Sequence, residues 1–269
     1  MEEEIDVYKH LYPDAIIHPL YLPGEEAIRR MMSSDSFRFA ITSRGLTAEE
    51  TEYVTKQNTK VMLKPLAQDA IAMIVNAENK DTSLTIQQAK AIFTGKINTW
   101  KQINPASPLG DILLVFDHEK SSTVQHIRDS ILKGEKVTSK GFSAKSNPNV
   151  LQYVQKTPNA VGIIGINWIS DKDDDRSEGF LKGIKTMYLE TNPNCEMSEK
   201  SVQPHQSAVK LNCYPLQRFM YAVNREPGFK LGTGFITFLA NGGTGQRVIL
   251  KAGMVPYFIV SRTIMMPTK

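Results

Sequence analysis

The chain has 269 residues, enough for one large domain or for two lobes of ordinary size. Apolar residues make up 41% and charged residues 22%, which excludes an intrinsically disordered chain. The net charge is +4, but the 32 basic residues are scattered among 28 acidic ones without a dense Lys/Arg block. This distribution argues against nucleic acid as a partner and suits a small anionic ligand.

The sequence does not decide in which cellular compartment the protein is found. No apolar stretch approaches the roughly 18 residues that span a bilayer, and the acidic start MEEEIDVYKH is not a signal peptide. The protein is either cytoplasmic or has lost an upstream targeting segment. Cys195 and Cys213 lack metal-ligand spacing, and the sequence allows either a disulfide or two free thiols.

Predicted helices and strands alternate along the chain. Periodicity and capping signals predict helices at 2–12, 24–34, 47–58, 85–95, 122–132 and 148–157, and further helices within 234–253. Thr47 and Glu50 predict a capping box at the start of 47–58, and Thr85 is expected to cap 85–95. Apolar runs predict strands at 14–22, 37–44, 70–76, 111–116, 160–169, 183–189 and 218–224, with a solvated loop at the charge run 171–179. This alternation predicts an α/β protein with largely parallel sheets, and the number of strands favours two lobes.

Three hydroxyls stand together at the start of a predicted helix in FDHEKSSTVQHIRDSI, residues 116–131. The first N–H groups of a helix have no partner inside it, and the helix dipole favours negative charge there. A tetrahedral oxyanion could accept hydrogen bonds from these N–H groups and from Ser121, Ser122 and Thr123. Ordinary N-capping is the alternative, and it explains one of the three hydroxyls.

Two further strand-to-helix junctions carry candidate ligand-binding residues. Thr42, Ser43 and Arg44 follow a strand in AITSRG, where polar groups point to the usual ligand crevice of an α/β sheet. Arg44 is either an oxyanion partner or an ordinary surface arginine. In LPGEEA, Gly24 allows close backbone approach, whereas Glu25 opposes anion binding.

Catalytic and cofactor signatures do not appear in the sequence. There is no GxSxG elbow, Walker A, GxGxxG after a strand, or HExxH. A hydrolase using a hydroxyl of residues 121–123 with His118 or His126 as the base is the enzymatic alternative. Nothing in the sequence supplies its orienting carboxylate, so we expect a binding protein that is not an enzyme and needs no cofactor or metal.

Taken in order, these segments resemble the phosphate-binding receptors of ABC transporters, which have the type II periplasmic binding-protein fold. TIQQAKAIFTGKINTWKQIN (85–104) is similar to the family pattern T-x-x-Q-L-x-x-I-F-x-G-x-I-x-x-W. The SST of residues 121–123 stands where the family has SGT before a helix. TPNAVGIIG, YPLQRFMYAVNRE and FITFLANGGTGQRVILKAGMVP match later family segments.

The resemblance implies a two-lobed α/β fold with mostly parallel sheets flanked by helices and a ligand cleft between the lobes. Lobe 1 would comprise 1–79 and 205–269, without the first strand of the family, and lobe 2 would comprise 80–204. The ligand-binding residues would be Ser121, Ser122, Thr123, Thr42, Ser43, Arg44, Gly24 and Glu25. Asp117 stands where the family usually has an arginine, and it could pair with Arg44 across the cleft.

The resemblance also implies a function and a location. The protein would be a monomeric receptor for inorganic phosphate or a similar oxyanion, delivering it to an ABC permease. It would be periplasmic and lipid-anchored through a removed N-terminal segment. The acidic Asp117 and Glu25 and the curtailed N-terminus keep an alternative open: a sensor or scaffold with the receptor fold that has lost phosphate binding.

Overall fold

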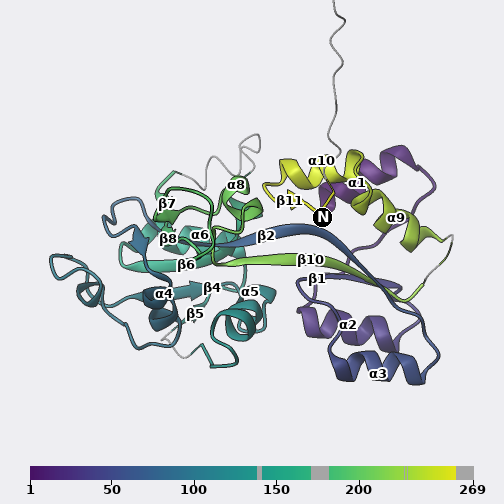
Figure 1. The fold of residues 1–269 in the computed structure, drawn as a ribbon, viewed down its shortest axis with the longest axis horizontal. Coiled ribbons are helices and arrows are strands. Elements are labelled where there is room, and N and C mark those ends of the chain that lie inside the picture. The colour runs from purple at the N-terminus through teal and green to yellow at the C-terminus, as the bar shows by residue number, and fades with distance from the viewer. Residues whose placement is uncertain (138–140, 171–181, 227, 229, 259–269) are drawn as a thin grey trace, which may run out of the picture.

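The computed structural model describes residues 1–137, 141–170, 182–226, 228 and 230–258. Two lobes are joined by two long strands, β2 (Met62–Asn76) and β10 (Gln217–Asn224), which pair in antiparallel orientation (Figure 1). The main sheet runs in the order β1-β10-β2-β6-β4-β5, with β7 and β11 also paired to β2. One continuous sheet therefore passes through both lobes.

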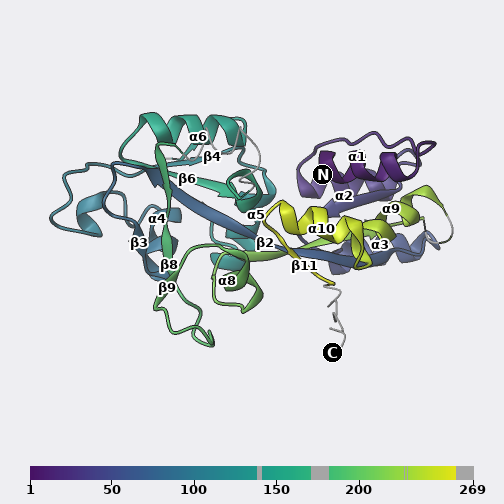
Figure 2. The ribbon, with the colours of Figure 1, turned by 90° about the horizontal axis from the view of Figure 1, so that it is seen from above.

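Lobe 1 is built around the far ends of the crossing strands, and helices cover both faces of its sheet (Figures 1 and 2). Its remaining elements are α1 (Glu2–Leu11), α2 (Gly24–Ser33), β1 (Phe39–Thr42), α3 (Ala48–Lys56), α9 (Leu231–Ala240), α10 (Thr244–Lys251) and β11 (Val255–Pro256).

Lobe 2 contains the parallel part of the sheet, in which β4 pairs with both β5 and β6. Its elements are β3 (Ser83–Leu84), α4 (Ile86–Phe93), β4 (Leu113–Phe116), α5 (Ser122–His126), β5 (Phe142–Ser143), α6 (Asn147–Lys156), β6 (Ala160–Gly165), β7 (Ile184–Thr186), β8 (Tyr188–Glu190), β9 (Ser201–Val202) and α8 (Gln206–Lys210). A π-helical turn, Ile127–Ile131, continues α5.

The prediction of an α/β protein is confirmed, but the expectation of mostly parallel sheets is wrong for the described strands. Parallel pairing is confined to β3–β8, β4–β5 and β4–β6, whereas the other described pairs are antiparallel. The reason is β2, which runs antiparallel to each of its partners, β6, β7, β10 and β11. A strand that crosses between lobes needs no helical return, which parallel pairing would require.

Local sequence signals predicted the starts of helices α3 and α4 correctly. The predicted capping box of α3 is present, with Thr47 accepting from the Glu50 N–H and the Glu50 side chain accepting from the Thr47 N–H. The predicted cap of α4 at Thr85 is likewise completed by Gln88. Each such pair satisfies two N–H groups that the helix leaves without partners.

The predicted strand at 14–22 is wrong. Residues 15–23 belong to no strand or helix, and Ile16 is 69% exposed. The apolar composition suggested a buried strand, but no neighbouring strand among the described residues pairs with this segment. The charge run 171–179 lies outside the described residues, as does the tail from 259 onward.

Side-chain packing separates the two lobes along the crossing strands. Residues 70–75 of β2 and the segment 208–216 pack in the large apolar core of lobe 2. Leu66 of β2 and Ala222 of β10 pack in the smaller core of lobe 1, with α1 and α9. We therefore propose lobe boundaries close to residues 69 and 217, inside the crossing strands.

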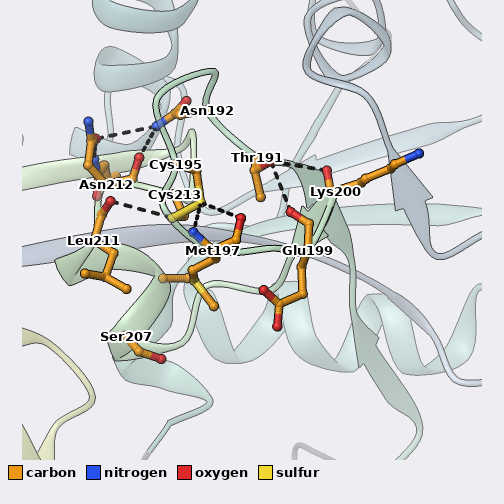
Figure 3. The surroundings of a disulfide bond; sticks show 12 residues. Thr191, Asn192, Cys195, Met197, Glu199, Lys200, Ser207, Leu211, Asn212 and Cys213 are labelled. Atoms are coloured by element: carbon orange, nitrogen blue, oxygen red, sulfur yellow. Dashed lines mark hydrogen bonds between the residues drawn. A yellow bond between two sulfur atoms is a disulfide. The ribbon is translucent and has the colours of Figure 1, made fainter.

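A disulfide joins Cys195 and Cys213, the pairing that the sequence left open (Figure 3). The two Cα atoms lie 4.7 Å apart, and the bond closes a segment of 18 residues that carries β9 and α8. Cys213 is fully buried, and the Asn192 side chain donates to the Asn212 carbonyl at 2.8 Å beside the bond. The bond therefore fixes the segment between Cys195 and Cys213 to the core of lobe 2. No described helix is both long and apolar enough to cross a membrane.

Replacing both cysteines should lower stability without changing the fold. Loop-closure entropy for a segment of this length predicts a loss of about 3 kcal/mol for the double variant Cys195→Ser/Cys213→Ser. Urea unfolding followed by circular dichroism measures this difference. A midpoint equal to that of the oxidised wild type would contradict the bond's stabilising role, and the reduced wild type serves as the control.

Candidate functional site

The two lobes touch where the N-terminal end of α2 meets α5, and Figure 1 shows α5 on the side of lobe 2 nearest lobe 1. A Cβ atom built on Gly24 would lie 3.6 Å from Oε1 of Gln125. Glu25 Oε1 lies 3.6 Å from Nη2 of Arg128. We call this contact region the junction; it comprises these four residues together with Ser122 and Arg218. Two of the predicted ligand-binding segments therefore face each other across it.

The N-terminus of α2 is available for hydrogen bonding. Pro23 occupies the cap position and no side chain caps the helix. The Ala27 N–H bonds to the Pro23 carbonyl, whereas the N–H groups of Gly24, Glu25 and Glu26 have no acceptor among the described residues. Uncapped N–H groups and the helix dipole together favour an anion at this end of the helix.

The three hydroxyls at α5 have different surroundings. Ser121 is the N-cap, and its Oγ accepts from the Val124 N–H at 3.3 Å, so the capping alternative is confirmed for this residue. Ser122 is half-buried and its Oγ accepts from Nη1 of Arg218 at 3.2 Å. Thr123 is buried, with 5% of its surface exposed. Among the three, Ser122 is the hydroxyl held by a cation at the junction.

A buried ion pair on the crossing strands reaches this helix, and the sequence analysis missed it. Arg218 of β10 donates from Nε and Nη2 to Oδ2 of Asp69 on β2, at 2.9 and 2.7 Å. The two residues are paired in the β10–β2 register and are 8% and 3% exposed. Two sequence signals could have indicated these residues. Arg218 begins the apolar run RFMYAVN, and Asp69 comes just before the apolar run AIAMIV.

Arg44 is held within lobe 1 and does not pair with Asp117. Its guanidinium donates to both carboxylate oxygens of Glu50 at 2.7 and 2.9 Å, and to the Gly45 carbonyl at 2.8 Å. The Glu50 hydrogen bonds raise the pKa of Arg44, and the Arg44 hydrogen bonds lower the pKa of Glu50. The suggested pairing across the lobes is therefore wrong, because α3 supplies a nearer carboxylate at the end of its capping box.

Asp117 is tied to lobe 2. Its carbonyl accepts from Ser143 Oγ at 2.9 Å, and its Oδ2 is 3.5 Å from Nδ2 of Asn147. Its Oδ1 is buried without a hydrogen-bond partner among the described residues. These contacts place Asp117 among β4, β5 and α6.

The hydroxyl-bearing residues beside Arg44 support the turn after β1. Thr42 is 4% exposed, and its Oγ1 donates to the Arg44 carbonyl at 2.6 Å. Ser43 is half-buried. Thr42 thus stabilises the local backbone, and Ser43 remains the more accessible of the two.

The hydrolase alternative requires a hydrogen bond from a hydroxyl of residues 121–123 to His118 or His126, and the contacts of these histidines are with other groups. His118 Nδ1 accepts from the Lys120 N–H at 3.0 Å, and His126 Nδ1 lies 3.3 Å from Ser130 Oγ. Ser121 Oγ is engaged with the helix backbone. Within the described residues, no group of three or more His, Cys, Asp or Glu side chains could hold a metal ion.

Among its described residues, lobe 2 has surface hollows at two places that can be compared with the predicted site. One lies between α4 and the turn that follows α5, and the other lies beside β5 and α6. Neither is lined by a predicted ligand-binding residue, so they are separate from the junction.

Comparison with known proteins defines the class of the chain. A family model described as a PBP superfamily domain matches residues 5–242. The chain therefore belongs to the PBP superfamily, and the type II periplasmic binding-protein fold expected from the sequence is confirmed by solved structures.

Particular relatives point to phosphate receptors. The chain is 27% identical over 208 residues to the "Phosphate-binding protein PstS" of Staphylococcus saprophyticus, covering 77% of this chain and 60% of the relative. It is 26% identical over 227 residues to the Borreliella burgdorferi protein of the same name, covering 81% and 72%. It is 28% identical over 194 residues to the Staphylococcus aureus protein of that name, and the match covers 71% of this chain and 54% of the relative. The chain thus spans between about half and three quarters of the length of these relatives.

Solved structures extend the likeness over nearly the whole chain. A putative phosphate ABC transporter substrate-binding protein from Clostridium perfringens, solved with bound phosphate, superposes with a TM-score of 0.73 at 23% identity, covering 96% of this chain and 94% of the other. An ABC-type phosphate transport receptor from Vibrio cholerae gives 0.68 at 22% identity, covering 95% and 94%. At this identity, the likeness establishes the fold.

His126 should make the protein less stable in mild acid. Burial, and then the positive charge of Arg218, lowers the pKa of His126 to about 4. Since an unfolded histidine titrates near 6.5, the unfolded state binds more protons between these values, and stability should fall as pH drops from 6.5 to 4. His126→Gln should flatten this fall by an amount on the order of 1 to 3 kcal/mol. The free energy of unfolding is measured at pH 4.5 and at pH 7.5 for the wild type and for His126→Gln. If the change between the two pH values is the same for both proteins, the prediction is wrong.

Proposed function

We propose that this protein is an extracytoplasmic receptor that binds inorganic phosphate and delivers it to an ABC permease. The observation that carries the proposal is the meeting of two helix N-termini from different lobes at the junction. The uncapped N–H groups of α2 lie beside α5, whose Ser122 hydroxyl accepts from Arg218. Amide donors and short hydroxyls are the groups that recognise an oxyanion.

The proposed ligand-binding residues fall into two groups. Ser121, Ser122 and Thr123 contribute backbone N–H groups and one available hydroxyl from lobe 2. Lobe 1 contributes Gly24 and Glu25 through their backbone, with Thr42, Ser43 and Arg44 at the neighbouring strand end. Asp117 is proposed as a supporting residue behind the site. Binding between lobes allows hinge closure about the crossing strands, as is usual for two-lobed receptors.

The location and partners follow from the same proposal. The relatives are named as phosphate-binding proteins, and two solved structures of the same fold come from phosphate ABC transport. The Cys195–Cys213 disulfide suits an oxidising compartment outside the cytoplasm. We propose a monomeric receptor, held near the membrane by a lipid anchor, that engages a permease and not nucleic acid.

A second candidate is a sensor or scaffold that keeps the fold without binding phosphate. The close approach of Gly24 to Gln125, and the ion pair between Glu25 and Arg128, favour it. Carboxylates at Glu25 and Asp69 also oppose an anion at the junction. Phosphate binding distinguishes the two functions.

Calorimetry with phosphate and sulfate tests the receptor function. The wild type should bind phosphate more tightly than sulfate, and Ser122→Ala should weaken phosphate binding by roughly tenfold, because one hydrogen bond to a charged ligand is lost. Ser33→Ala, at the exposed C-terminal end of α2, is the control and should bind as the wild type does. No heat and no thermal shift at millimolar phosphate would remove the receptor function and leave the sensor or scaffold.

Removing the charge of Glu25 should strengthen phosphate binding. Its carboxylate lies at the N-terminal end of α2, where an anion would be held, and it is exposed and paired only weakly with Arg128. Loss of one repelling charge in a partly solvated site predicts about a two- to fivefold gain for Glu25→Gln. Glu52→Gln, at an exposed position of α3, removes the same charge away from the junction and should change the affinity little. Equal affinity for all three proteins would contradict this placement.

A further inference from the structure

A second contact between the lobes lies away from the junction, at the C-terminal end of α10. The side-chain amide of Gln206, in α8 of lobe 2, donates to the Leu250 carbonyl at 2.7 Å and to the Met254 carbonyl at 2.8 Å. Ser170, also in lobe 2, donates from Oγ to the Ala252 carbonyl at 3.0 Å. We call the contact made by these five residues the clasp.

The clasp gives a helix of one lobe its C-terminal cap from the other lobe. The last carbonyls of a helix lack partners within its regular hydrogen-bond pattern. Both hydrogens of the Gln206 amide go to carbonyls at or just beyond the end of α10. The single hydrogen of the Ser170 hydroxyl is shared between Ala252 and the Ile166 carbonyl, which lies 2.8 Å away within lobe 2. The clasp therefore ties the end of α10 directly to lobe 2.

Gly253 brings the two lobes very close together at the clasp. Its φ is +81°, and a Cβ atom built on it would overlap both Oγ and Cβ of Ser170. A residue with a side chain would be strained by this backbone angle and would also collide with lobe 2, so the turn after α10 needs glycine here. Because no space is left between the two surfaces, the clasp forms at one separation of the lobes.

Lobe 2 holds its side of the clasp firmly. Ala208 and Val209 of α8 are buried in the core of lobe 2. Cys213, just after the helix, donates its N–H to the Ala208 carbonyl at 2.8 Å and is bonded to Cys195. With α8 fixed in this way, Gln206 cannot follow α10 when the lobes turn. A change in the angle between the lobes must therefore break its hydrogen bonds.

The clasp and the junction lie on opposite sides of the crossing strands. Figures 1 and 2 show α8 and β11 on one side of β2 and β10, and α2 and α5 on the other. The crossing strands connect the lobes, so a rotation that separates α2 from α5 also displaces α10 relative to α8. Both contacts are formed in this structure. The clasp thus stabilises the closed arrangement, in which the lobes meet at the junction.

We propose that Gln206 and Ser170 are positioning residues that hold the lobes in the closed arrangement and so slow the release of bound phosphate. They act through the angle between the lobes and not by contact with the ligand. The proposal rests on the proposed function, because it concerns the affinity of the same site. A receptor binds its ligand more weakly in proportion as its binding-competent arrangement is less populated. The clasp raises this population before phosphate arrives.

Release of phosphate tests the effect of the clasp on the ligand. The double variant Ser170→Ala/Gln206→Ala should release radiolabelled phosphate about tenfold faster than the wild type after dilution into unlabelled phosphate, because hydrogen bonds between the lobes are lost. Its affinity by calorimetry should fall by a similar factor, since such changes appear mainly in the dissociation rate. A residue that only supports the fold of its own lobe would leave the release rate unchanged.

Matched controls change the same residue types within one lobe. Ser33 Oγ donates to the Arg29 carbonyl inside α2, and Gln152 is exposed on α6. Ser33→Ala and Gln152→Ala should release phosphate as the wild type does. Thermal melts show whether each protein is folded. Each single clasp variant should give part of the effect, so the single variants decide the outcome if the double variant does not fold.

A measurement without ligand tests the clasp independently. Glu52 is exposed on α3 of lobe 1, and Glu135 is exposed beyond α5 in lobe 2. Nitroxide labels on Glu52→Cys and Glu135→Cys report the distance between the lobes by double electron–electron resonance, because Cys195 and Cys213 are paired and do not react. In the absence of phosphate, Ser170→Ala/Gln206→Ala should shift this distance to longer values and broaden its distribution.

The two measurements separate this proposal from the receptor function. If the folded wild type does not bind phosphate, the receptor function is overturned, and the label distances still decide whether the clasp holds the lobes together. If the wild type binds phosphate but the folded clasp variants release it at the wild-type rate, the clasp proposal alone is overturned. Label distances that do not change in the clasp variants also overturn it.

Discussion

The antiparallel pairing of β2 with β10 is the constraint on which the rest of the structure depends. These strands run from the apolar core of one lobe into that of the other, and each lobe is completed by their opposite ends. Because their backbone hydrogen bonds continue across the boundary, the lobes share one sheet. Any relative motion of the lobes must therefore be absorbed by twisting or bending this two-stranded connection.

The same pairing sets the electrostatics of the junction. It brings Asp69 and Arg218 opposite each other in a region with little solvent, where a lone charge would be very unfavourable. The ion pair satisfies that requirement and also fixes the guanidinium against Ser122. A second effect falls on His126, whose protonated form is disfavoured by burial and by the neighbouring arginine. The region therefore keeps a low net charge although it is rich in titratable groups.

The features predicted from the sequence are those determined by nearby residues. The capping box at Thr47, the caps at Thr85 and Ser121 and the helix that begins at Gly24 each depend on residues within four positions. The ion pair of Asp69 and Arg218 joins residues 149 positions apart, so local patterns could mark each residue but could not show that the two residues pair. The segment 14–22 shows the opposite failure: its local composition suits a strand, but strand formation needs a neighbour.

The pairing of β2 with β10 is irregular at one point: Met220 pairs with Ala67 and Tyr221 with Pro65, so Leu66 of β2 is the extra residue. An extra residue in one strand reverses which side chains face each side of the sheet beyond it. In β2, Asp69 therefore lies on one side of the extra residue, and Lys64 and Leu63, which pair with Ala222 and Val223, lie on the other. The extra residue lets β2 keep Asp69 opposite Arg218 in one lobe while it changes which of its side chains face each layer of the other lobe. Deleting Leu66 would make the pairing regular and would turn the residues on one side of it to the opposite face of the sheet.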